Sequence, residues 1–304
     1  MAHSARITPQ PRVTKGPVNV TSRDNRWLKR FRAELAGERG EDGSVGVEGV
    51  RLVEAALGSG LPMEALLMSE SGARHLARVA RILDLGVPVF RTSDKLFAGV
   101  TDTQTPQGIA ALVRPRSATM EDLVRGAALV VVLVGVQDPG NVGTIVRAAE
   151  AFGATGAATC SSGGIGAADP LAPKALRASA GSALRLPIVH GLSSRAVFEE
   201  LRRAQVKIVA TVADAAAATP KNSNAATVFP PWSLEWRTPC AILIGNEGAG
   251  LPAEIVRDAD ARVCIPQAAS TAAIGIESLN AAMAASVLLY EAMRQRLAGR
   301  QKTS

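Results

Sequence analysis

A run of apolar residues at positions 129–136, mostly valine and leucine, constrains the fold of this 304-residue chain more than any other feature. A strand that is buried on one face alternates apolar and polar residues, whereas a strand of a parallel sheet is continuously apolar because both faces are covered. Segments of strand and helix character alternate after this run. Strands are expected at residues 156–159, 186–190, 207–211, 240–244 and 262–265, and helices at residues 142–152, 173–183, 195–204, 252–258 and 279–297. The alternation predicts an α/β domain with a largely parallel sheet.

The part of the chain ahead of this domain predicts a second, smaller α/β unit. Helices are expected there at residues 25–35 and 49–57, and strands at residues 65–68, 87–90 and 108–113. The polar, proline-containing start of the chain is expected to form a flexible basic arm. The predicted organisation is therefore an arm at residues 1–20, a first unit at 21–114, a linker at 115–122, a second unit at 123–298 and a tail at 299–304.

The formal net charge of +7 favours a polyanionic partner, because a protein that neutralises phosphates releases their counterions. Basic residues in the two terminal segments would explain part of the same excess. The charge alone leaves both interpretations open.

The three cysteines, Cys160, Cys240 and Cys264, lie far apart and form no C-x-x-C pair, so the sequence predicts no metal site. Each lies in or beside an apolar segment, which favours buried, reduced thiols and a cytoplasmic location. The first residues lack the apolar segment of a signal peptide. The run at 129–136 is too short to cross a membrane, which takes about 20 residues.

A first motif follows this run, where a turn leads into the helix expected at residues 142–152. Asn141 is well placed to cap that helix. Arg147 lies opposite the apolar stripe of the helix, and Gly143, one turn earlier, is expected to leave its path open toward the carboxyl end of the strand. Open α/β sheets bind their ligands at that end. The alternative is that Arg147 is a solvated surface charge.

A second motif is a glycine-rich loop after the strand expected at residues 240–244. It contains Gly245, Asn246, Glu247, Gly248 and Gly250, and the glycines would let the backbone approach a ligand closely. Its spacing matches neither the phosphate loop nor the dinucleotide-binding motif, and a carboxylate would repel phosphate. Glu247 suits a cationic or hydroxyl-bearing group, or else it holds the loop by accepting backbone hydrogen bonds.

A third motif begins with Ile265 and Pro266 and ends with Ser278, Leu279 and Asn280 at the start of the last expected helix. Ser278 or Asn280 would be suitable helix caps. Together with the glycine-rich loop, this segment would close a pocket around a ligand.

Taken together, the three motifs resemble those of the SpoU, or TrmH, family within the SPOUT superfamily of methyltransferases. The matching residues are Asn141, Gly143, Arg147, Gly245, Asn246, Glu247, Gly248, Ile265, Pro266, Ser278, Leu279 and Asn280. The segment with Lys174 and Arg177 resembles a further part of the family, and the first unit resembles the substrate-binding domain that precedes the catalytic domain in some members. The resemblance covers about residues 20–297.

The resemblance implies a deep trefoil knot in the second unit, a homodimer, and transfer of a methyl group from S-adenosylmethionine to a ribose 2′-hydroxyl of RNA. It implies catalytic or positioning roles for Arg147, Asn141, Glu247, Ser278 and Asn280. The implied cofactor-binding residues are Gly245, Asn246, Gly248, Ile265, Pro266 and Leu279. RNA contacts are expected from Lys174, Arg177, Arg26, Lys29 and Arg30. No metal ion and no membrane are expected.

Several points stay open at this stage. The substrate-binding unit favours ribosomal RNA over transfer RNA, and an inactive RNA-binding relative is an alternative. A nucleotide-dependent α/β enzyme is less favoured, because the phosphate-loop spacing is missing. The segment at residues 267–277 is longer than the usual family loop, which leaves its shape beside the cofactor open. Position 148 is alanine, where the family often has a hydroxyl residue.

Overall fold

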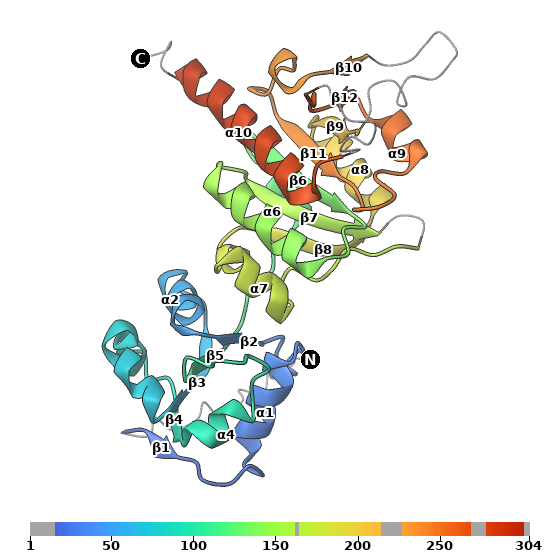
Figure 1. The fold of residues 1–304 in the computed structure, drawn as a ribbon. Coiled ribbons are helices and arrows are strands. Elements are labelled where there is room, and N and C mark those ends of the chain that lie inside the picture. Colours follow the sequence, from blue (N-terminus) through green and yellow to red (C-terminus); the bar gives the residue numbers. More distant parts are fainter. Residues whose placement is uncertain (1–15, 162–163, 214–226, 269–277, 301–304) are drawn as a thin grey trace, which may run out of the picture. The chain divides into compact units, whose positions relative to one another are not determined.

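The computed structural model describes residues 16–161, 164–213, 227–268 and 278–300. The chain divides into two compact units, Met1–Pro115 and Arg116–Ser304, and each has its own sheet (Figure 1). Residues 267–277, which were expected to form the long loop beside the cofactor, lie mostly outside the described residues.

The first unit is built on a five-stranded mixed sheet with the strand order β1-β4-β3-β5-β2. The strands are β1 (Val18–Asn19), β2 (Val45–Glu48), β3 (Met63–Ser69), β4 (Val89–Thr92) and β5 (Ile109–Val113). The helical segments are α1 (Arg26–Leu35), α2 (Val50–Gly58), the 3₁₀ helix η1 (Ser71–Val79), α3 (Arg81–Asp84) and α4 (Asp94–Ala98). β1, β4 and β3 are parallel, whereas β5 runs antiparallel to β3 and β2.

The longer elements of this unit agree with the sequence, and the shortest ones do not. The helices expected at 25–35 and 49–57 and the strands expected at 65–68 and 108–113 are confirmed. β1 lies inside the segment that was expected to be a flexible arm, and the backbone N–H of Val20 donates to the carbonyl of Arg91 (2.7 Å). The arm expectation is therefore wrong for residues 18–20, because they pair with β4, while residues 1–15 lie outside the described residues.

The second unit is built on a seven-stranded sheet whose strands are all parallel, in the order β10-β12-β9-β11-β6-β7-β8. The strands are β6 (Leu129–Val134), β7 (Gly156–Ser161), β8 (Ile188–Ser193), β9 (Lys207–Thr211), β10 (Val228–Phe229), β11 (Cys240–Ile244) and β12 (Ala261–Val263). The predicted parallel α/β domain is confirmed. β10 was not expected, because a strand of two residues has too little periodicity to be recognised.

Helices cover both faces of this sheet (Figure 1). They are α5 (Met120–Leu123), α6 (Pro139–Ala151), α7 (Pro173–Ser179), α8 (Ser194–Arg203), α9 (Ala253–Asp258) and α10 (Ala281–Arg300). α5, α8 and α9 pack on one face, α6 and α10 on the other, and α7 packs against α6. α5 begins inside the segment expected to be a linker, because Thr119 and Asp122 form a capping box there.

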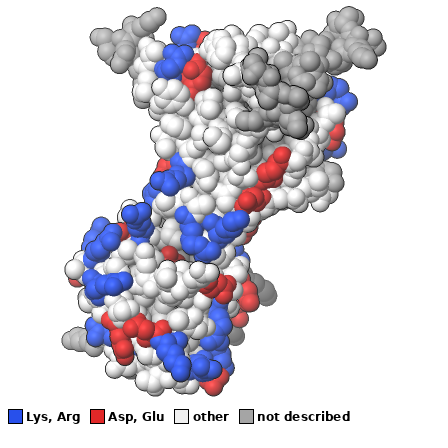
Figure 2. Space-filling model, in the orientation of Figure 1, with Lys and Arg blue, Asp and Glu red and all other residues white. Residues whose placement is uncertain are grey.

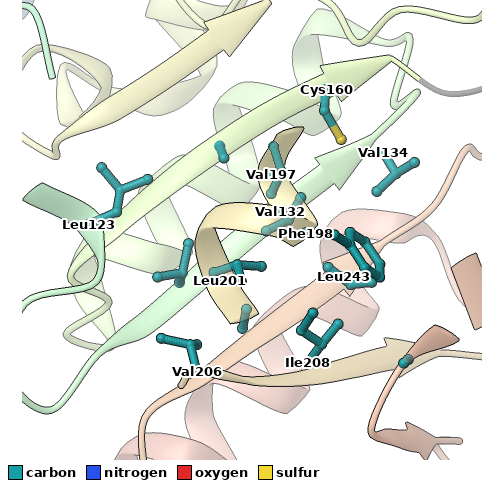
Figure 3. Close-up of a cluster of buried hydrophobic side chains, with 14 of the residues drawn as sticks. Leu123, Val132, Val134, Cys160, Val197, Phe198, Leu201, Val206, Ile208 and Leu243 are labelled. Atoms are coloured by element: carbon teal, nitrogen blue, oxygen red, sulfur yellow. The ribbon is translucent and has the colours of Figure 1, made fainter. Parts of the chain in front are cut away.

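Burial explains why β6 is continuously apolar. All six of its residues are buried, and alternate side chains point to opposite faces of the sheet. Val130, Val132 and Val134 face α8, in one cluster with Val197, Phe198 and Leu201 (Figure 3). The other three residues of β6 face α6 and α10, so neither face of the strand tolerates a polar residue.

Two of the three cysteines are buried as expected, Cys160 and Cys240, whereas Cys264 is half-buried. Burial raises the pKa of the Cys160 thiol to about 12. In the described part of the chain, no helix is long and apolar enough to cross a membrane.

Candidate functional site

A cavity lies at the carboxyl ends of β9, β11 and β12, where parallel sheets bind ligands. Its lining includes eight residues that the sequence singled out. These are Gly245, Asn246, Glu247, Gly248, Gly250, Ile265, Ser278 and Leu279. The second and third motifs therefore meet at one cavity, although more than thirty residues separate their ends, from Gly245 to Leu279.

The lining also includes residues that the sequence analysis missed. They are Thr211, Val212, Ala213, Ile244, Leu251, Val263, Gln267, Ala281, Ala284 and Leu288. The segment after β9 was recognisable in principle, since that strand was expected and ligands bind at strand ends. Ala284 and Leu288 had no such signal, because their place depends on how α10 packs. Pro266 was expected here but is not among the described residues that line the cavity.

Asn246 holds the glycine-rich loop in a tight turn. Its side-chain oxygen accepts the N–H groups of Gly248 and Ala249, both at 3.0 Å, and its amide donates to the carbonyl of Gly135 at the end of β6 (2.9 Å). A Cβ atom at Gly245 would lie 2.4 Å from the carbonyl carbon of Gly250, so this turn requires glycine. Asn246 thus shapes the cavity wall and ties it to the first motif.

Glu247 joins the glycine-rich loop to the first motif. Its carboxylate accepts the backbone N–H groups of Gln137 and Asp138, both at 3.1 Å, and the side-chain amide of Asn141 at 3.0 Å. Burial raises the pKa of Glu247, but the hydrogen bond from Asn141 and those from the backbone outweigh it, and the net pKa lies below the usual value. Of the two roles left open by the sequence, the geometry favours holding the loop.

Asn141 and Asn280 extend this link to the third motif. The side-chain amide of Asn280 donates to the side-chain oxygen of Asn141 (3.0 Å). The side-chain oxygen of Asn280 accepts the N–H groups of Ala282 (2.8 Å) and Met283 (3.3 Å), so it also caps α10 as expected. A continuous hydrogen-bonded relay, Asn280–Asn141–Glu247, therefore connects all three motifs.

The expectation that Asn141 caps α6 is wrong. The cap is Asp138, whose carboxylate accepts the N–H of Gly140 at 2.6 Å, and Pro139 occupies the first position of the helix. The helix begins earlier than the apolar stripe indicated. Asn141 lies within its first turn, which leaves its side chain available for the relay.

Gly143 has a different role from the expected one. A Cβ atom at this position would lie 2.3 Å from the carbonyl oxygen of Ala175 and 2.7 Å from the Cβ of Ala178, both in α7. Glycine is needed because α7 packs directly on α6, and not because a path must stay open for Arg147.

Arg147 lies on the exposed side of α6, less than two turns after Asn141. It is not among the described residues that line the cavity, and no hydrogen bond or ion pair of its side chain is found within the described part of the chain. The structure therefore places Arg147 on the helix that carries the relay, with its guanidinium accessible.

The residues expected to contact RNA lie on two helices. Lys174 and Arg177 are exposed on α7, and the Lys174 ammonium contacts the Asp138 carboxylate (2.8 Å). On α1, Arg26 is exposed and Lys29 pairs with Asp24 (3.3 Å). Arg30 is largely engaged inside the unit, because it contacts Glu34 (2.6 Å), Ser44 (2.9 Å) and Asp42 (3.3 Å). No group of three or more metal-ligating side chains is found among the described residues.

Two family models match the chain. One described as the SpoU rRNA Methylase family matches residues 128–290, and one described as an MRM3-like substrate binding domain matches residues 32–111. The first match spans the whole cavity and the relay, and the second lies within the first unit.

Curated and solved relatives are similar over nearly the whole chain. The 23S rRNA (guanosine(2553)-2′-O)-methyltransferase of Bacillus subtilis is 32% identical over 83% of this chain and 90% of its own length. The 23S rRNA (uridine(2479)-2′-O)-methyltransferase of Streptomyces viridochromogenes is 33% identical over 94% of this chain and 95% of its own. The crystal structure of an AdoMet-bound rRNA methyltransferase from Sinorhizobium meliloti is 30% identical, with a TM-score of 0.74, and covers 91% of this chain and 97% of its own.

Proposed function

Since the chain belongs to the SpoU rRNA methylase family, we propose that it methylates a ribose 2′-hydroxyl of ribosomal RNA at the cavity beside β9, β11 and β12. The methyl donor is S-adenosylmethionine, as in the AdoMet-bound relative. The observation that carries the site assignment is the relay Asn280–Asn141–Glu247, which joins the three motifs around one cavity. An arrangement that depends on three distant segments holds a ligand in a fixed orientation.

The residues that line the cavity fit S-adenosylmethionine. Most of the wall is aliphatic side chain or backbone, including Ile244, Val263 and Leu288, which suits an adenosine group. Gly245, Ile265 and Leu279 also line the cavity, and we expect their backbone groups to supply polar contacts to the cofactor. Glu247 adds one negative charge beside a cofactor that carries a sulfonium. When bound, S-adenosylmethionine supplies an electrophilic methyl group.

Arg147 orients the substrate in this proposal. A guanidinium donates hydrogen bonds in a fixed fork and accepts none. Arg147 would therefore align the 2′-hydroxyl for in-line attack by donating to its oxygen. The oxygen–methyl bond would form as the sulfonium–methyl bond breaks, and the hydroxyl proton would pass to water. Asn141 and Glu247 keep α6 in place against the cavity. Ser278, which lines the cavity, contributes a hydroxyl on the side of the third motif.

The experiment is Arg147→Ala, with transfer of labelled methyl groups to a 23S rRNA transcript as the readout. Loss of positioning is expected to lower the rate about 100-fold while calorimetry shows unchanged binding of S-adenosylmethionine. Arg195→Ala on α8 is the control, since it removes an exposed arginine far along the chain from the motifs. Near wild-type transfer by Arg147→Ala would remove the proposed role.

Ribosomal RNA is the substrate class that both curated relatives act on. The nucleotide is found by mapping 2′-O-methyl groups in total RNA from cells with and without this protein, and a mark in transfer RNA alone would overturn the assignment. A cytoplasmic location is part of the same proposal, and the free cysteines support it, because thiols stay reduced in that compartment.

A homodimer through α10 is a further part of the proposal. Four apolar side chains on one face of this helix are exposed, namely Met283 (61%), Val287 (43%), Tyr290 (51%) and Leu297 (50%). Figure 2 shows few charged side chains where α10 and α6 lie in Figure 1. An exposed apolar stripe of this kind is typical of a protein contact surface. Met283→Asp with Val287→Asp is expected to convert a dimer to a monomer in sedimentation, and an unchanged mass would contradict it.

The trefoil knot stays a prediction, because residues 269–277, between β12 and α10, lie outside the described residues.

A further inference from the structure

The first unit carries a set of arginines that the site described above does not use. Between residues 50 and 84, every residue with a basic charge at neutral pH is an arginine. These residues are Arg51 on α2, Arg74 and Arg78 on η1, and Arg81 on α3. All four side chains are exposed. We call this set the arginine surface.

Three arginines follow one another closely on the outer side of η1 and α3. Gly72, Val79 and Ile82 are buried in this part of the chain, whereas Arg74, Arg78 and Arg81 are exposed. Residues three apart lie above one another in a 3₁₀ helix, so Arg78 lies above His75, which is the chain neighbour of Arg74.

The surface is continuous with α2 through one ion pair. The Arg78 guanidinium donates two hydrogen bonds to the Glu54 carboxylate, at 2.7 and 2.6 Å. Arg51 lies one turn before Glu54 on the same helix. The pair fixes η1 against α2 and leaves one carboxylate, Glu54, within a surface of four guanidinium groups.

The other three arginines, Arg51, Arg74 and Arg81, form no ion pair with a carboxylate in the described part of the chain. The Arg74 Nε donates to the imidazole Nε2 of His75 (3.3 Å), which requires a neutral imidazole. Burial lowers the pKa of His75, and the charges of Arg74 and Arg78 lower it further, with Glu54 opposing them in part. The local field is thus positive. Acidic residues flank the segment formed by η1 and α3, with Glu70 just before η1 and Asp84 at the end of α3.

The basic residues of α1 differ in this respect. Arg30 contacts Glu34, Asp42 and Ser44, and its guanidinium also lies 5.6 Å from the ring centroid of Trp27. Lys29 pairs with Asp24. Much of the positive charge of α1 is therefore used inside the unit.

We propose that the arginine surface binds phosphate groups of the ribosomal RNA substrate. Arginine suits this role, because its planar fork matches the oxygens of a phosphate and it is always charged. Four guanidinium groups that are spread over the three helical segments α2, η1 and α3 would hold the backbone of a folded RNA without reading its sequence. Lys and Arg side chains gather along the edge of the first unit where α2 lies in Figure 1 (Figure 2). The proposal rests on the proposed function, which supplies the RNA.

The test is the triple variant Arg51→Ala, Arg74→Ala, Arg81→Ala. It keeps Arg78 and its pair with Glu54, so the contact between α2 and η1 is retained. Binding of a 23S rRNA transcript is measured at several salt concentrations. Each lost phosphate contact lowers the slope of log K against log salt by about 0.7–0.9, so the slope is expected to fall by about 2 to 3, and the affinity at 0.1 M salt by roughly 100-fold. Binding of S-adenosylmethionine stays unchanged.

The matched control removes the same charge elsewhere, by Arg125→Ala, Arg195→Ala and Arg203→Ala, which all replace exposed, ion-paired arginines of the second unit. A triple variant of the arginine surface that behaves like this control, or keeps the wild-type slope, would overturn the proposal.

The two proposals fail in different ways. If the wild-type protein methylates the transcript and the triple variant keeps its salt slope, the arginine surface is wrong and the function stands. If the slope falls as expected but the wild-type protein never methylates RNA, the surface is supported and the function is wrong. A wild-type protein that does not bind the transcript would overturn both.

Discussion

Replacing Glu247 with glutamine removes the charge of this side chain and keeps its size, so the variant tests whether the relay holds the cavity together. The Glu247 carboxylate accepts three hydrogen bonds, from the backbone of Gln137 and Asp138 and from the side chain of Asn141. A glutamine has one acceptor oxygen, and its amide N–H₂ group would face the remaining donor. With its oxygen in the place that accepts Asp138 and Asn141, a glutamine keeps two of the three bonds and loses the one from Gln137.

The size of the effect follows from these bonds. A hydrogen bond to a charged group contributes about 1.5–3 kcal/mol when it is buried, and Glu247 is exposed, so each bond is taken at or below the lower end of that range. The one lost bond then costs about 1.4 kcal/mol in the closed arrangement of the motifs. Since about 1.4 kcal/mol is tenfold in an equilibrium constant, the dissociation constant for S-adenosylmethionine is expected to rise by up to about tenfold.

Calorimetric titration with S-adenosylmethionine measures this change. The control is Glu254→Gln, which alters an exposed carboxylate in the first turn of α9 and is expected to leave the dissociation constant unchanged. A dissociation constant for Glu247→Gln within twofold of the wild-type value would refute the reasoning, because the relay would then make no difference to the cavity.

The same carboxylate predicts a pH dependence. The folded pKa of Glu247 lies below its usual value of about 4.3, so the folded state favours the charged form. The contribution of the Glu247 carboxylate to the free energy of unfolding is fully present above the usual pKa. It is lost as the pH falls through the lowered folded pKa. The melting temperature of the second unit should therefore show no pH dependence from this group between about pH 5 and pH 8. Glu247→Gln should lack the loss that the wild-type protein shows in acid.

Two further variants test the packing of the second unit, with calorimetric melting as the readout. Gly143→Ala is expected to destabilise this unit by about 1–2 kcal/mol, because the new methyl group meets the Ala175 carbonyl at 2.3 Å and overpacking outweighs the helix propensity gained. Gly58→Ala, which meets nothing within 4 Å, should not destabilise the first unit, and equal melting shifts would contradict the close approach. Arg296→Met should cost about 2–4 kcal/mol, because the guanidinium donates to four backbone carbonyls at 2.6–3.0 Å; an unchanged melting temperature would refute this anchoring role.

Some features of this protein follow from local sequence. The continuous apolar run of β6 predicted a parallel sheet, because a strand covered on both faces has no position for a polar residue. The turn formed by Gly245 and Asn246 was also recognisable, since a tight backbone turn needs glycine whatever surrounds it. The match of three ordered motifs to one family depended on such local requirements.

Other features were decided only when distant segments packed together. Asp138 and Asn141 are both suitable helix caps by residue type, and the structure uses the first as the cap and turns the second toward Glu247, more than a hundred residues away. Glycine is required at position 143 because α7 packs closely on α6 there. Residues 18–19 form the strand β1 because their backbone pairs with β4. Sequence periodicity records which face of an element is buried. It does not record which partner covers that face, because hydrogen bonds and close contacts between distant residues depend on the folded arrangement of the whole unit.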